Sequence, residues 1–391
     1  MSALADSWRG LRNWRHANAL LAAVVLLLAA LIPPNVFGQL SADLDVAIYA
    51  LAYVTFALGL NVVVGFAGLL DLGYVAFYAI GGYAIGWFAS DHFSRVKGGE
   101  GFHLGASDIA SELPGIHLNF LLILLIAMIL AAIAGAIIGL PTLRLRGDYI
   151  AIVTLAFGEI AGTIALNGDS VEPVKGYKLT LGQQAISPID EPSLPGFGTF
   201  NSALDLTDYY YLGVIMVAIV LFVSFMLRDS RLGRAWIAIR EDEVAAASMG
   251  VPLVRTKLLS YAIGAAIGGV AGAFLGAYTQ AINSNQYQFS FSILVLAMII
   301  LGGLGSIWGC VVGAVALSVI DRKLIPDTFH TAPHDLFGLN FTASEISFGI
   351  FGFMLVMMMI ARPEGLIPER RRKLELTEGV GTDEALYEAQ M

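Results

Sequence analysis

The sequence of 391 residues is 57% hydrophobic and only 14% charged, an apolar share above that of soluble domains, so we predict an integral membrane protein. The net charge of −9, with basic residues in short groups beside apolar runs, excludes a nucleic-acid-binding surface. The single cysteine, Cys310, lies in an apolar run and excludes an intrachain disulfide and a zinc cluster.

The first apolar run, residues 17–32, follows three arginines and so superficially resembles a signal peptide. It lacks a small-residue cleavage site, because Pro33 and Pro34 close it, and it is about as long as a membrane span. We therefore predict that residues 1–43 form an N-terminal segment that retains this first span.

Further apolar runs follow along the chain, and a membrane-spanning helix needs about 20 mostly apolar residues. We predict an all-α integral membrane protein, a polytopic bundle of about ten transmembrane helices, with a transmembrane domain over residues 44–361. The remaining residues, 362–391, are expected to form a cytoplasmic, disordered tail, because their last part is acidic and has no apolar period. The ten expected spans are 17–32, 44–63, 71–90, 119–140, 149–166, 210–227, 258–281, 290–303, 306–322 and 344–361.

Two of the apolar stretches are interrupted by glycine clusters. Residues 44–90 are divided only at 65–73, and residues 290–322 are divided at 302–305. Each interruption is either a re-entrant turn or a loop between two spans, so broken or re-entrant helices belong to the predicted fold. Because backbone groups freed inside a membrane must be covered by protein or line a cavity, interruptions in both halves point to a substrate path.

Polar residues and glycines at the interruptions are candidates for lining that path, although a tyrosine is equally common as an anchor at the membrane interface. Glu159 is the one ionisable residue well inside a predicted span, where a charge is costly and therefore often functional. It is either a hydrogen-bonded helix-packing residue beside Thr154 and Thr163 or part of the gate. The candidates for the translocation path are Asn61, Gly65, Gly68, Asp71, Tyr74, Glu159, Gly302, Gly303 and Gly305.

Lysine and arginine collect on the cytoplasmic flanks of membrane spans, so their distribution tests the order of the spans. With ten spans and both termini in the cytoplasm, 16 of the 22 basic residues lie on the cytoplasmic side and 6 lie outside. The predicted topology agrees with this rule. It puts the loop 228–257 in the cytoplasm and the segments 91–118 and 167–209 outside.

The loop 228–257 is the longest polar segment that has a helical pattern of its own. Acidic residues 241–243 precede the small residues 244–249, and Gly250 and Pro252 follow, as at the start and end of a helix. We predict a short helix across the membrane face, with small residues that let another protein come close. An ordinary connecting loop is an equal alternative from the pattern alone.

The chain carries no motif for catalysis. No Gly-Lys dipeptide occurs, so a phosphate-binding P-loop is absent, and if ATP drives this protein another chain hydrolyses it. All six histidines fall outside the predicted spans, which disfavours haem or metal ligation within the bundle, and the metalloprotease motif H-E-x-x-H is absent. We predict no catalytic residue, no metal and no cofactor.

Four phrases are together more specific than any single glycine-rich stretch: LGLNVVVGFAGLLDLGYVAFYAIGGY at 58–83, LRLRGDYIAIVTLAFGEI at 143–160, GRAWIAIREDEVAAASMGV at 233–251 and ILGGLGSIWGCVVGA at 300–314. In this order, they resemble the permeases of branched-chain amino acid ABC importers, the LivM-like family. The resemblance implies that 228–257 is a cytoplasmic coupling loop whose helix docks in a groove of a separate ATPase subunit. The implied coupling residues are Arg240, Glu243, Ala245, Ala246 and Gly250.

The resemblance also implies a transport subunit and not an enzyme. The implied partners are a second, LivH-like permease subunit, two ATPase subunits, a periplasmic solute-binding protein that docks on the external segments, and membrane lipid. The implied function is inward transport of branched-chain or related amino acids across the bacterial inner membrane. One departure concerns the substrate, because similar permeases carry a phrase close to LTGGPNGI where residues 179–186 read LTLGQQAI.

A stand-alone ion-coupled carrier of small polar solutes is the alternative function. Such a carrier would not need the cytoplasmic helix, and it would carry more ionisable residues inside its spans than Glu159 alone. A membrane-embedded enzyme is a third class, which no catalytic constellation supports. Binding of an ATPase subunit to this chain separates the first two classes.

Overall fold

The computed structural model describes residues 41–94, 100–105, 113–142, 145, 147–173, 176–194, 198–200, 205–328, 347–362 and 364–368. Within these residues, five helices are long and apolar enough to cross a membrane, and three further apolar helices are shorter. The predicted first span, 17–32, and nearly all of the predicted tail lie outside the described residues. The five long helices cover Ala42–Phe66, Phe120–Thr142, Tyr149–Ser170, Thr207–Asp229 and Leu253–Thr279.

Each predicted span from residue 44 onward falls on a helix. The helical membrane fold is therefore confirmed, while the count of about ten spans stays a prediction. The elements are α3 (Ala42–Leu60), η1 (Asn61–Phe66), α4 (Val75–Phe88), β1 (Ala89–Ser90), η2 (Asp91–Phe93), β2 (Phe102–Leu104), β3 (Ile116–Leu118), α5 (Phe120–Thr142), α6 (Asp148–Asn167), η5 (Gly168–Ser170), β4 (Ser193–Leu194), β5 (Gly198–Thr199), α7 (Thr207–Asp229), α8 (Arg231–Glu241), α9 (Glu243–Ser248), α10 (Leu253–Thr279), η6 (Ser284–Tyr287), α11 (Phe289–Gly302), α12 (Ile307–Val319), η7 (Ile320–Thr328) and α14 (Ser347–Ala361).

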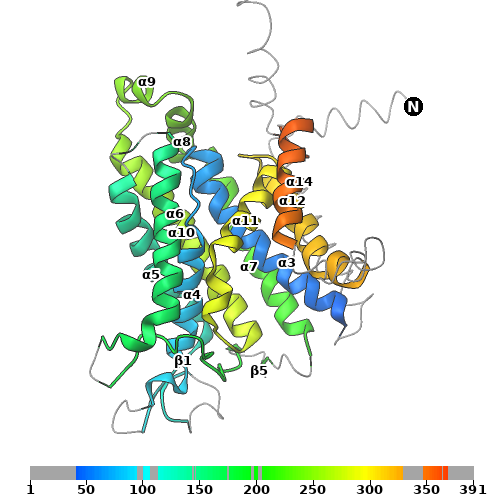
Figure 1. Cartoon of the computed structure of the whole chain (residues 1–391). Helices are drawn as coiled ribbons and strands as arrows, with labels where there is room; N and C mark the ends of the chain where they lie inside the picture. The colour runs from blue at the N-terminus through cyan, green and yellow to red at the C-terminus, as the bar shows by residue number, and fades with distance from the viewer. Residues whose placement is uncertain are drawn as a thin grey trace, which may run out of the picture.

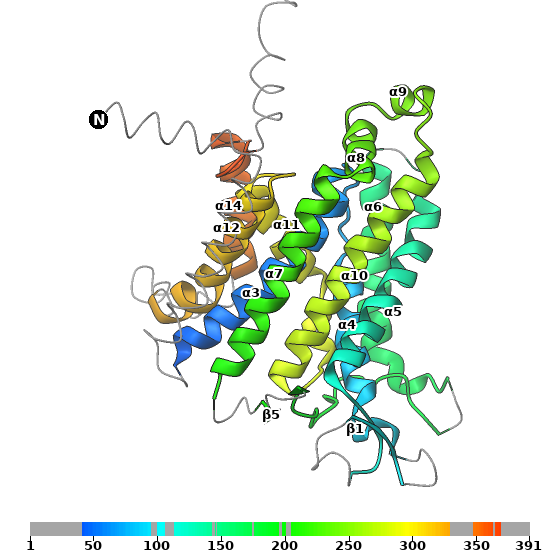
Figure 2. The same cartoon turned by 180° about the vertical axis from the view of Figure 1, so that it is seen from behind.

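The helices form two groups that stand side by side (Figures 1 and 2). One group contains α4, α5, α6 and α10, and the other contains α3, α7, α11, α12 and α14. Helix α10 joins the groups because it packs against α5 and α4 and also against α3. The loop with α8 and α9 lies at the top of Figure 1 and the small sheet with β1 lies at the bottom, so we name these the α9 end and the β1 end.

Glycines on α10 bring three helix backbones close together. Gly264 lies against the Gly59 carbonyl of α3, and Gly272 lies against the Tyr78 carbonyl of α4, so neither position has room for a Cβ atom. Small residues commonly join membrane helices in this way, because lipid provides no hydrophobic driving force between them. Helix α10 thereby holds α3 and α4, the helices on either side of residues 67–74, in position.

The outer faces of α5 and α7 are apolar, as expected for surfaces against lipid. The large apolar side chains exposed on the outer faces are Leu121, Leu125, Met128, Ile129, Ile133, Ile137 and Leu140 of α5, and Tyr211, Ile215, Ile219, Phe222 and Met226 of α7.

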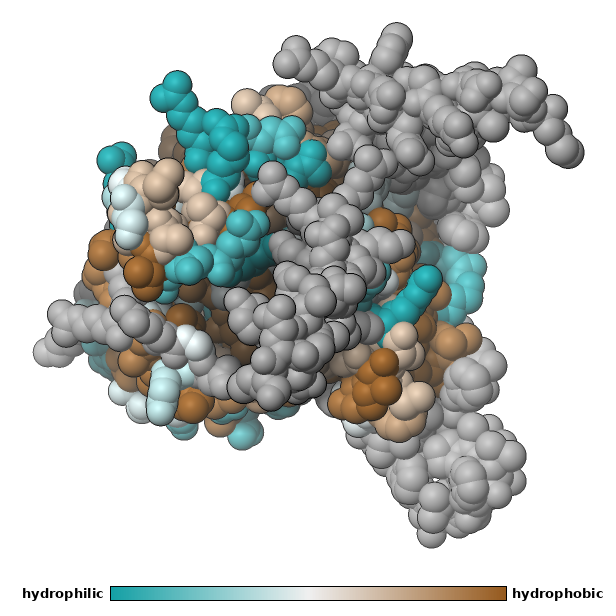
Figure 3. Space-filling model, turned by 90° about the horizontal axis from the view of Figure 1, so that it is seen from above, coloured by the Kyte–Doolittle hydropathy of each residue, from teal (hydrophilic) through white to brown (hydrophobic). Residues whose placement is uncertain are grey.

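Figure 3 looks down on the α9 end, where hydrophilic residues lie on the end face beside hydrophobic ones.

The two long segments at the β1 end form one cap. Strand β3 pairs antiparallel with β1 and parallel with β2, which ties the first segment to the end of α4. The second segment is held by the Trp87 indole, which donates to the Leu179 carbonyl at 2.8 Å, and by backbone hydrogen bonds between Ile186 and Ile282. The segments predicted to lie outside are therefore joined to the bundle and to each other.

A buried pair inside this cap makes its stability depend on pH. His117 Nδ1 lies 2.7 Å from a carboxylate oxygen of Asp190, and the imidazole is almost fully buried. Burial alone would lower the pKa of His117, but the hydrogen bond and charge of Asp190, with a contribution from Asp91, raise the pKa above its ordinary value. The stability that this pair contributes is therefore complete below the unfolded pKa of about 6.5 and is lost as the pH rises through the higher folded pKa.

We expect Asp190→Asn to lower the free energy of unfolding by about 2 kcal/mol at acidic pH and to abolish the loss of stability that this pair causes as the pH rises, because a hydrogen bond to a charged group has about this value. The measurement is the unfolding temperature of the purified protein in detergent between about pH 5 and pH 8, the range around the ordinary histidine pKa. If the unfolding temperature of the parent protein fell no more with rising pH than that of Asp190→Asn, the assignment would be contradicted.

Candidate functional site

The first predicted interruption is present. Helix α3 continues into the wider turns of η1, residues 67–74 are not helical, and α4 begins at Val75. The groups around this break are held by side chains and carbonyls of three other helices, as irregular backbone inside a membrane requires. The bonds run from the Leu72 amide to Thr154 Oγ1 (3.0 Å), from the Val75 amide to Ser292 Oγ (3.0 Å), and from the Tyr74 hydroxyl to the Gly264 carbonyl (2.5 Å).

The second predicted interruption lies between α11 and α12. Helix α11 ends at Gly302, and α12 begins at Ile307 after Ser306, whose side chain accepts from the Gly309 amide. The segment that follows α14 covers this break, because the Leu366 amide donates to the Leu301 carbonyl and the Ile367 amide donates to the Gly302 carbonyl, both at 2.9 Å. The second break is thus closed by backbone from the far end of the described chain.

The two breaks meet at Asn61. Its side-chain oxygen Oδ1 accepts a hydrogen bond from the Gly305 amide at 3.0 Å, and Asn61 is almost fully buried. A Cβ atom at Gly65 would lie 2.8 Å from the same amide nitrogen. Three of the predicted path residues, Asn61, Gly65 and Gly305, are therefore in direct contact.

Arg240 connects the loop 228–257 to this junction. It lies near the end of α8, and its Nη1 atom donates to the Gly65 carbonyl at 2.7 Å. Gly68, with φ of +69°, lies directly beneath the aliphatic part of the Arg240 side chain. The residue predicted for coupling thus contacts two residues predicted for the path.

The loop contains two short helices at an angle to each other, where a single helix was predicted. Glu241 ends α8, and Asp242 has extended backbone angles, so it starts a new helix. The Asp242 carboxylate accepts from the amides of Val244 and Ala245 at 2.8 and 2.9 Å, which is an N-cap for α9. The predicted end of the helix is confirmed, because α9 finishes just before Gly250.

The coupling candidates on α9 differ in their accessibility. Ala245 and Gly250 are exposed, whereas Glu243 forms an ion pair with Lys257 at 2.6 Å and so ties α9 to α10. Ala246 is only 4% exposed, so its side chain supports the loop from inside and does not itself present a docking surface. The sequence interpretation missed Val244 and Met249, which are 65% and 85% exposed and apolar. Their apolar character beside a run of alanines was the available signal.

Two carboxylates complete the predicted path. Asp71 is buried in the first break, where its Oδ1 atom accepts from the Gly73 amide at 2.9 Å. Its Oδ2 atom has no hydrogen-bond partner among the described residues. Glu159, expected inside the bundle, is instead exposed on α6, and within the described chain it forms neither a hydrogen bond nor an ion pair. Thr154 binds the break and not Glu159.

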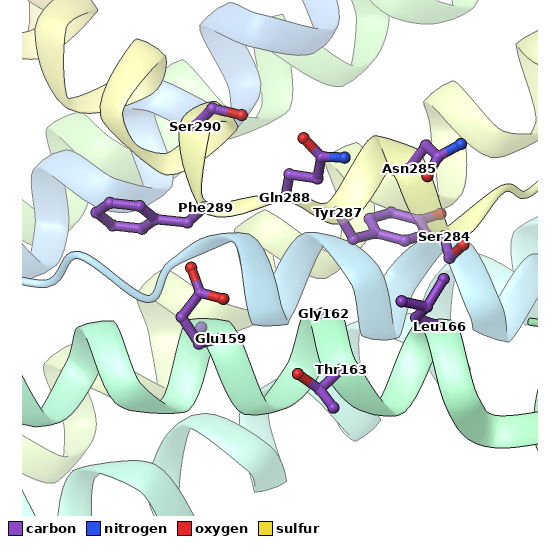
Figure 4. A pocket seen from close by; sticks show the side chains of 11 residues that line it. Glu159, Gly162, Thr163, Leu166, Ser284, Asn285, Tyr287, Gln288, Phe289 and Ser290 are labelled. Atoms are coloured by element: carbon purple, nitrogen blue, oxygen red, sulfur yellow. The ribbon is translucent and has the colours of Figure 1, made fainter. Parts of the chain in front are cut away.

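Glu159 lines a cavity of about 410 Å³ between α6 and residues 284–290 (Figure 4). In this view the Glu159 carboxylate rises from α6 toward the start of α11, near Phe289. Asn285 and Gln288 extend to the other side of the η6 segment. Of the predicted path residues, only Glu159 lines this cavity, because the others cluster at the breaks or near them.

Comparisons with known proteins agree with the resemblance noted in the sequence. A family model described as the permease component of branched-chain amino acid transport systems matches residues 44–360. The LivM permease protein of the high-affinity branched-chain amino acid transport system of Escherichia coli K12 is 35% identical over 92% of this chain and 78% of its own. The probable LivM of Methanocaldococcus jannaschii is 26% identical over 81% of this chain and 91% of its own.

A shorter similarity links the chain to the companion permease of such a system. LivH of Salmonella typhimurium is 33% identical over 108 residues, which is 28% of this chain and 35% of LivH. No solved structure matches the fold significantly. The match over residues 44–360 and the identity to LivM identify this chain as a member of the permease-component family of branched-chain amino acid transport systems, a family of multi-pass membrane proteins.

Proposed function

We propose that this chain is a permease subunit of an ABC importer that moves branched-chain or related amino acids inward across the bacterial inner membrane, driven by separate ATPase subunits. The observation that carries the proposal is the hydrogen bond from Arg240 to the Gly65 carbonyl, because it joins an exposed loop to a broken span. The family membership supports the substrate class. The proposed partners are a LivH-like permease, two ATPase subunits and a periplasmic binding protein.

The distribution of charge supports the proposed orientation, with the α9 end and both termini in the cytoplasm and the cap at the β1 end outside, where a binding protein would dock. Basic residues favour the cytoplasmic ends of spans. Among the described residues, seven lie on elements at the α9 end and three on elements at the other end. The seven are Arg228, Arg231, Arg234, Arg240, Arg255, Lys257 and Arg362, and the three are Lys178, Arg322 and Lys323.

In the proposed mechanism, ATPase subunits contact α9 and displace α8 when they bind and hydrolyse ATP. Arg240 transmits this displacement to Gly65, and Asn61 transmits it to Gly305 on the second break. A coupling route of this kind requires an element with two arrangements that both sites bias, and the non-helical residues 67–74 fit that role. Transport would then follow from a change in how the two breaks meet.

The docking part of the proposal is tested by Met249→Asp, with Met249→Leu as the matched control. Met249 is 85% exposed, so a charge there leaves the internal contacts of the loop intact. In a groove of a partner protein, however, the buried carboxylate should weaken binding by about 2 kcal/mol or more. The measurement is the affinity of the ATPase subunits for the permease pair in lipid nanodiscs. We expect at least about a thirtyfold loss for the aspartate variant and little change for leucine.

Equal ATPase binding by Met249→Asp and the parent would refute docking through the exposed face of α9. Amino acid uptake into vesicles that contain the permease pair without any ATPase subunit, driven by a proton gradient, would support an ion-coupled carrier instead. Absence of amino acid uptake by the complete complex, with ATP and binding protein present, would overturn the proposed function itself.

A further inference from the structure

Glu159 has an unusual position for a side chain exposed on a membrane helix. It lies about 12 Å along the helix axis from the end of α6 at Asn167, given a rise of about 1.5 Å per residue. Exposed apolar side chains, Ile152, Ile160 and Ile164, accompany it on the same helix. A carboxylate that faced lipid at this depth would be costly, so the face of α6 that carries it borders water or another polar group. The outer faces of α5 and α7 carry no such charge.

The cavity beside Glu159 has the chemistry of a site for a small polar molecule. Its volume of about 410 Å³ falls within the usual range of about 300–1,000 Å³ for such sites. Gly158 and Gly162 leave part of the wall on α6 without side chains, and the opposite wall includes the polar residues Ser284, Gln288 and Ser290. Among the residues that line it, Glu159 carries the one formal charge.

The cavity also adjoins the first break. Gly158, at one edge of the cavity, packs directly on Gly73, and a Cβ atom on Gly158 would lie 2.9 Å from the Gly73 Cα atom. The other edge is at Leu166, whose carbonyl lies against Gly182 in the cap. The cavity therefore extends from the cap at the β1 end to the non-helical residues 67–74, and a movement of those residues changes its wall.

We propose that this cavity binds the transported amino acid and that the Glu159 carboxylate pairs with its α-ammonium group. A carboxylate with no partner in the described chain can pair with a cation, and an amino acid provides one together with a carboxylate for the polar residues of the opposite wall. Phe289 and Leu166, both on the lining, offer apolar contacts for an aliphatic side chain. The inference rests on the proposed function, because it assigns a substrate group to a residue of the same path.

A cationic side chain of the second permease subunit is the competing partner for Glu159. A subunit contact predicts that Glu159→Gln prevents assembly of the permease pair. A substrate contact predicts normal assembly and weaker binding of molecules that carry an ammonium group, and only of those. The charge-preserving variant Glu159→Asp should retain much of the binding in the second case.

The test uses the complete transporter in membrane vesicles, with a cysteine introduced by Ser290→Cys, since the native Cys310 is fully buried. The rate of maleimide labelling is measured with leucine, with 3-methylbutylamine, which lacks the carboxylate, and with 4-methylpentanoate, which lacks the ammonium group. We expect protection by leucine and by the amine, but not by the acid.

In the Glu159→Gln background, the leucine concentration for half protection should rise about tenfold or more, because a lost charge pair typically costs that much. Equal protection in Glu159→Gln and the parent would overturn the ammonium assignment, as would protection by 4-methylpentanoate alone. Loss of the second permease subunit from purified Glu159→Gln would assign the carboxylate to the subunit interface. A transporter that takes up leucine normally yet shows no protection at Ser290→Cys would refute the cavity while leaving the proposed function intact.

Discussion

Replacing Arg240 with alanine should give an assembled transporter that binds its ATPase subunits and hydrolyses ATP but moves little amino acid. Arg240 Nη1 donates to the Gly65 carbonyl at 2.7 Å, and among the described residues no other side chain of α8 hydrogen-bonds to the first break. A hydrogen bond from a charged donor contributes about 1.5–3 kcal/mol. Its loss from the step that links the loop to the break should reduce transport per ATP hydrolysed by about tenfold or more.

Arg240→Lys is the matched control for this experiment, because it keeps the positive charge and one donor on a flexible chain, so its coupling should be intermediate. Gly68→Ala is a second route to the same result. Its Cβ atom would clash with the aliphatic part of Arg240, and its φ of +69° is unfavourable for alanine. Uptake and ATP turnover should be measured in the same proteoliposomes. A parallel loss of both in Arg240→Ala, with the ratio unchanged, would contradict a role in coupling.

The helices and their interruptions could be predicted because they are local properties of the chain. The length of an apolar run decides whether a helix spans a membrane, and a glycine cluster within the run marks the break. The predicted interruption at 65–73 therefore agrees with the non-helical residues 67–74. The end of α9 could also be predicted from the local sequence, because Gly250 adopts a φ of +87° that few other residues tolerate.

The contacts that give these elements a function could not be predicted from one sequence. Arg240 and Gly65 are 175 positions apart, and Asn61 and Gly305 are 244 positions apart. The sequence around one residue of each pair therefore does not indicate that it contacts the other residue. The burial of Ala246 could not be predicted from the sequence pattern either, because neighbouring alanines look alike in the sequence and Ala246 alone among them is buried. The division between α8 and α9 depends on Asp242. Its side chain can lie within the first turn of one helix or cap the start of a new helix, and the sequence does not distinguish the two.

Pattern alone also did not indicate a packing role for the glycines at the second break. Gly302, Gly303 and Gly305 were candidates for lining a path, and the structure gives the first two a clear packing role. A Cβ atom at Gly302 would clash with the Gly309 carbonyl of α12. A Cβ atom at Gly303 would lie 2.8 Å from the Ile367 carbonyl. These residues are small because three backbone segments meet here.

Gly303→Ala should therefore cause a large loss of stability. Gly303 has φ of +122° and ψ of +113°, a conformation that residues with a Cβ atom rarely adopt, so strain alone should cost about 1–3 kcal/mol. The contact with the Ile367 carbonyl adds to this strain, because backbone cannot move aside as a flexible side chain can. We expect low yield of folded protein and a clear fall in unfolding temperature.

Gly349→Ala in α14 is the control, because a Cβ atom there meets nothing within 4 Å and the residue is helical. Alanine in a helix is favoured over glycine by about 1 kcal/mol, so this variant should be as stable as the parent or slightly more stable. Fluorescence-detected size-exclusion chromatography after graded heating measures both variants in the same detergent. If Gly303→Ala kept the parent stability but lost transport, the glycine would belong to the path, and the packing explanation of the second break would be wrong.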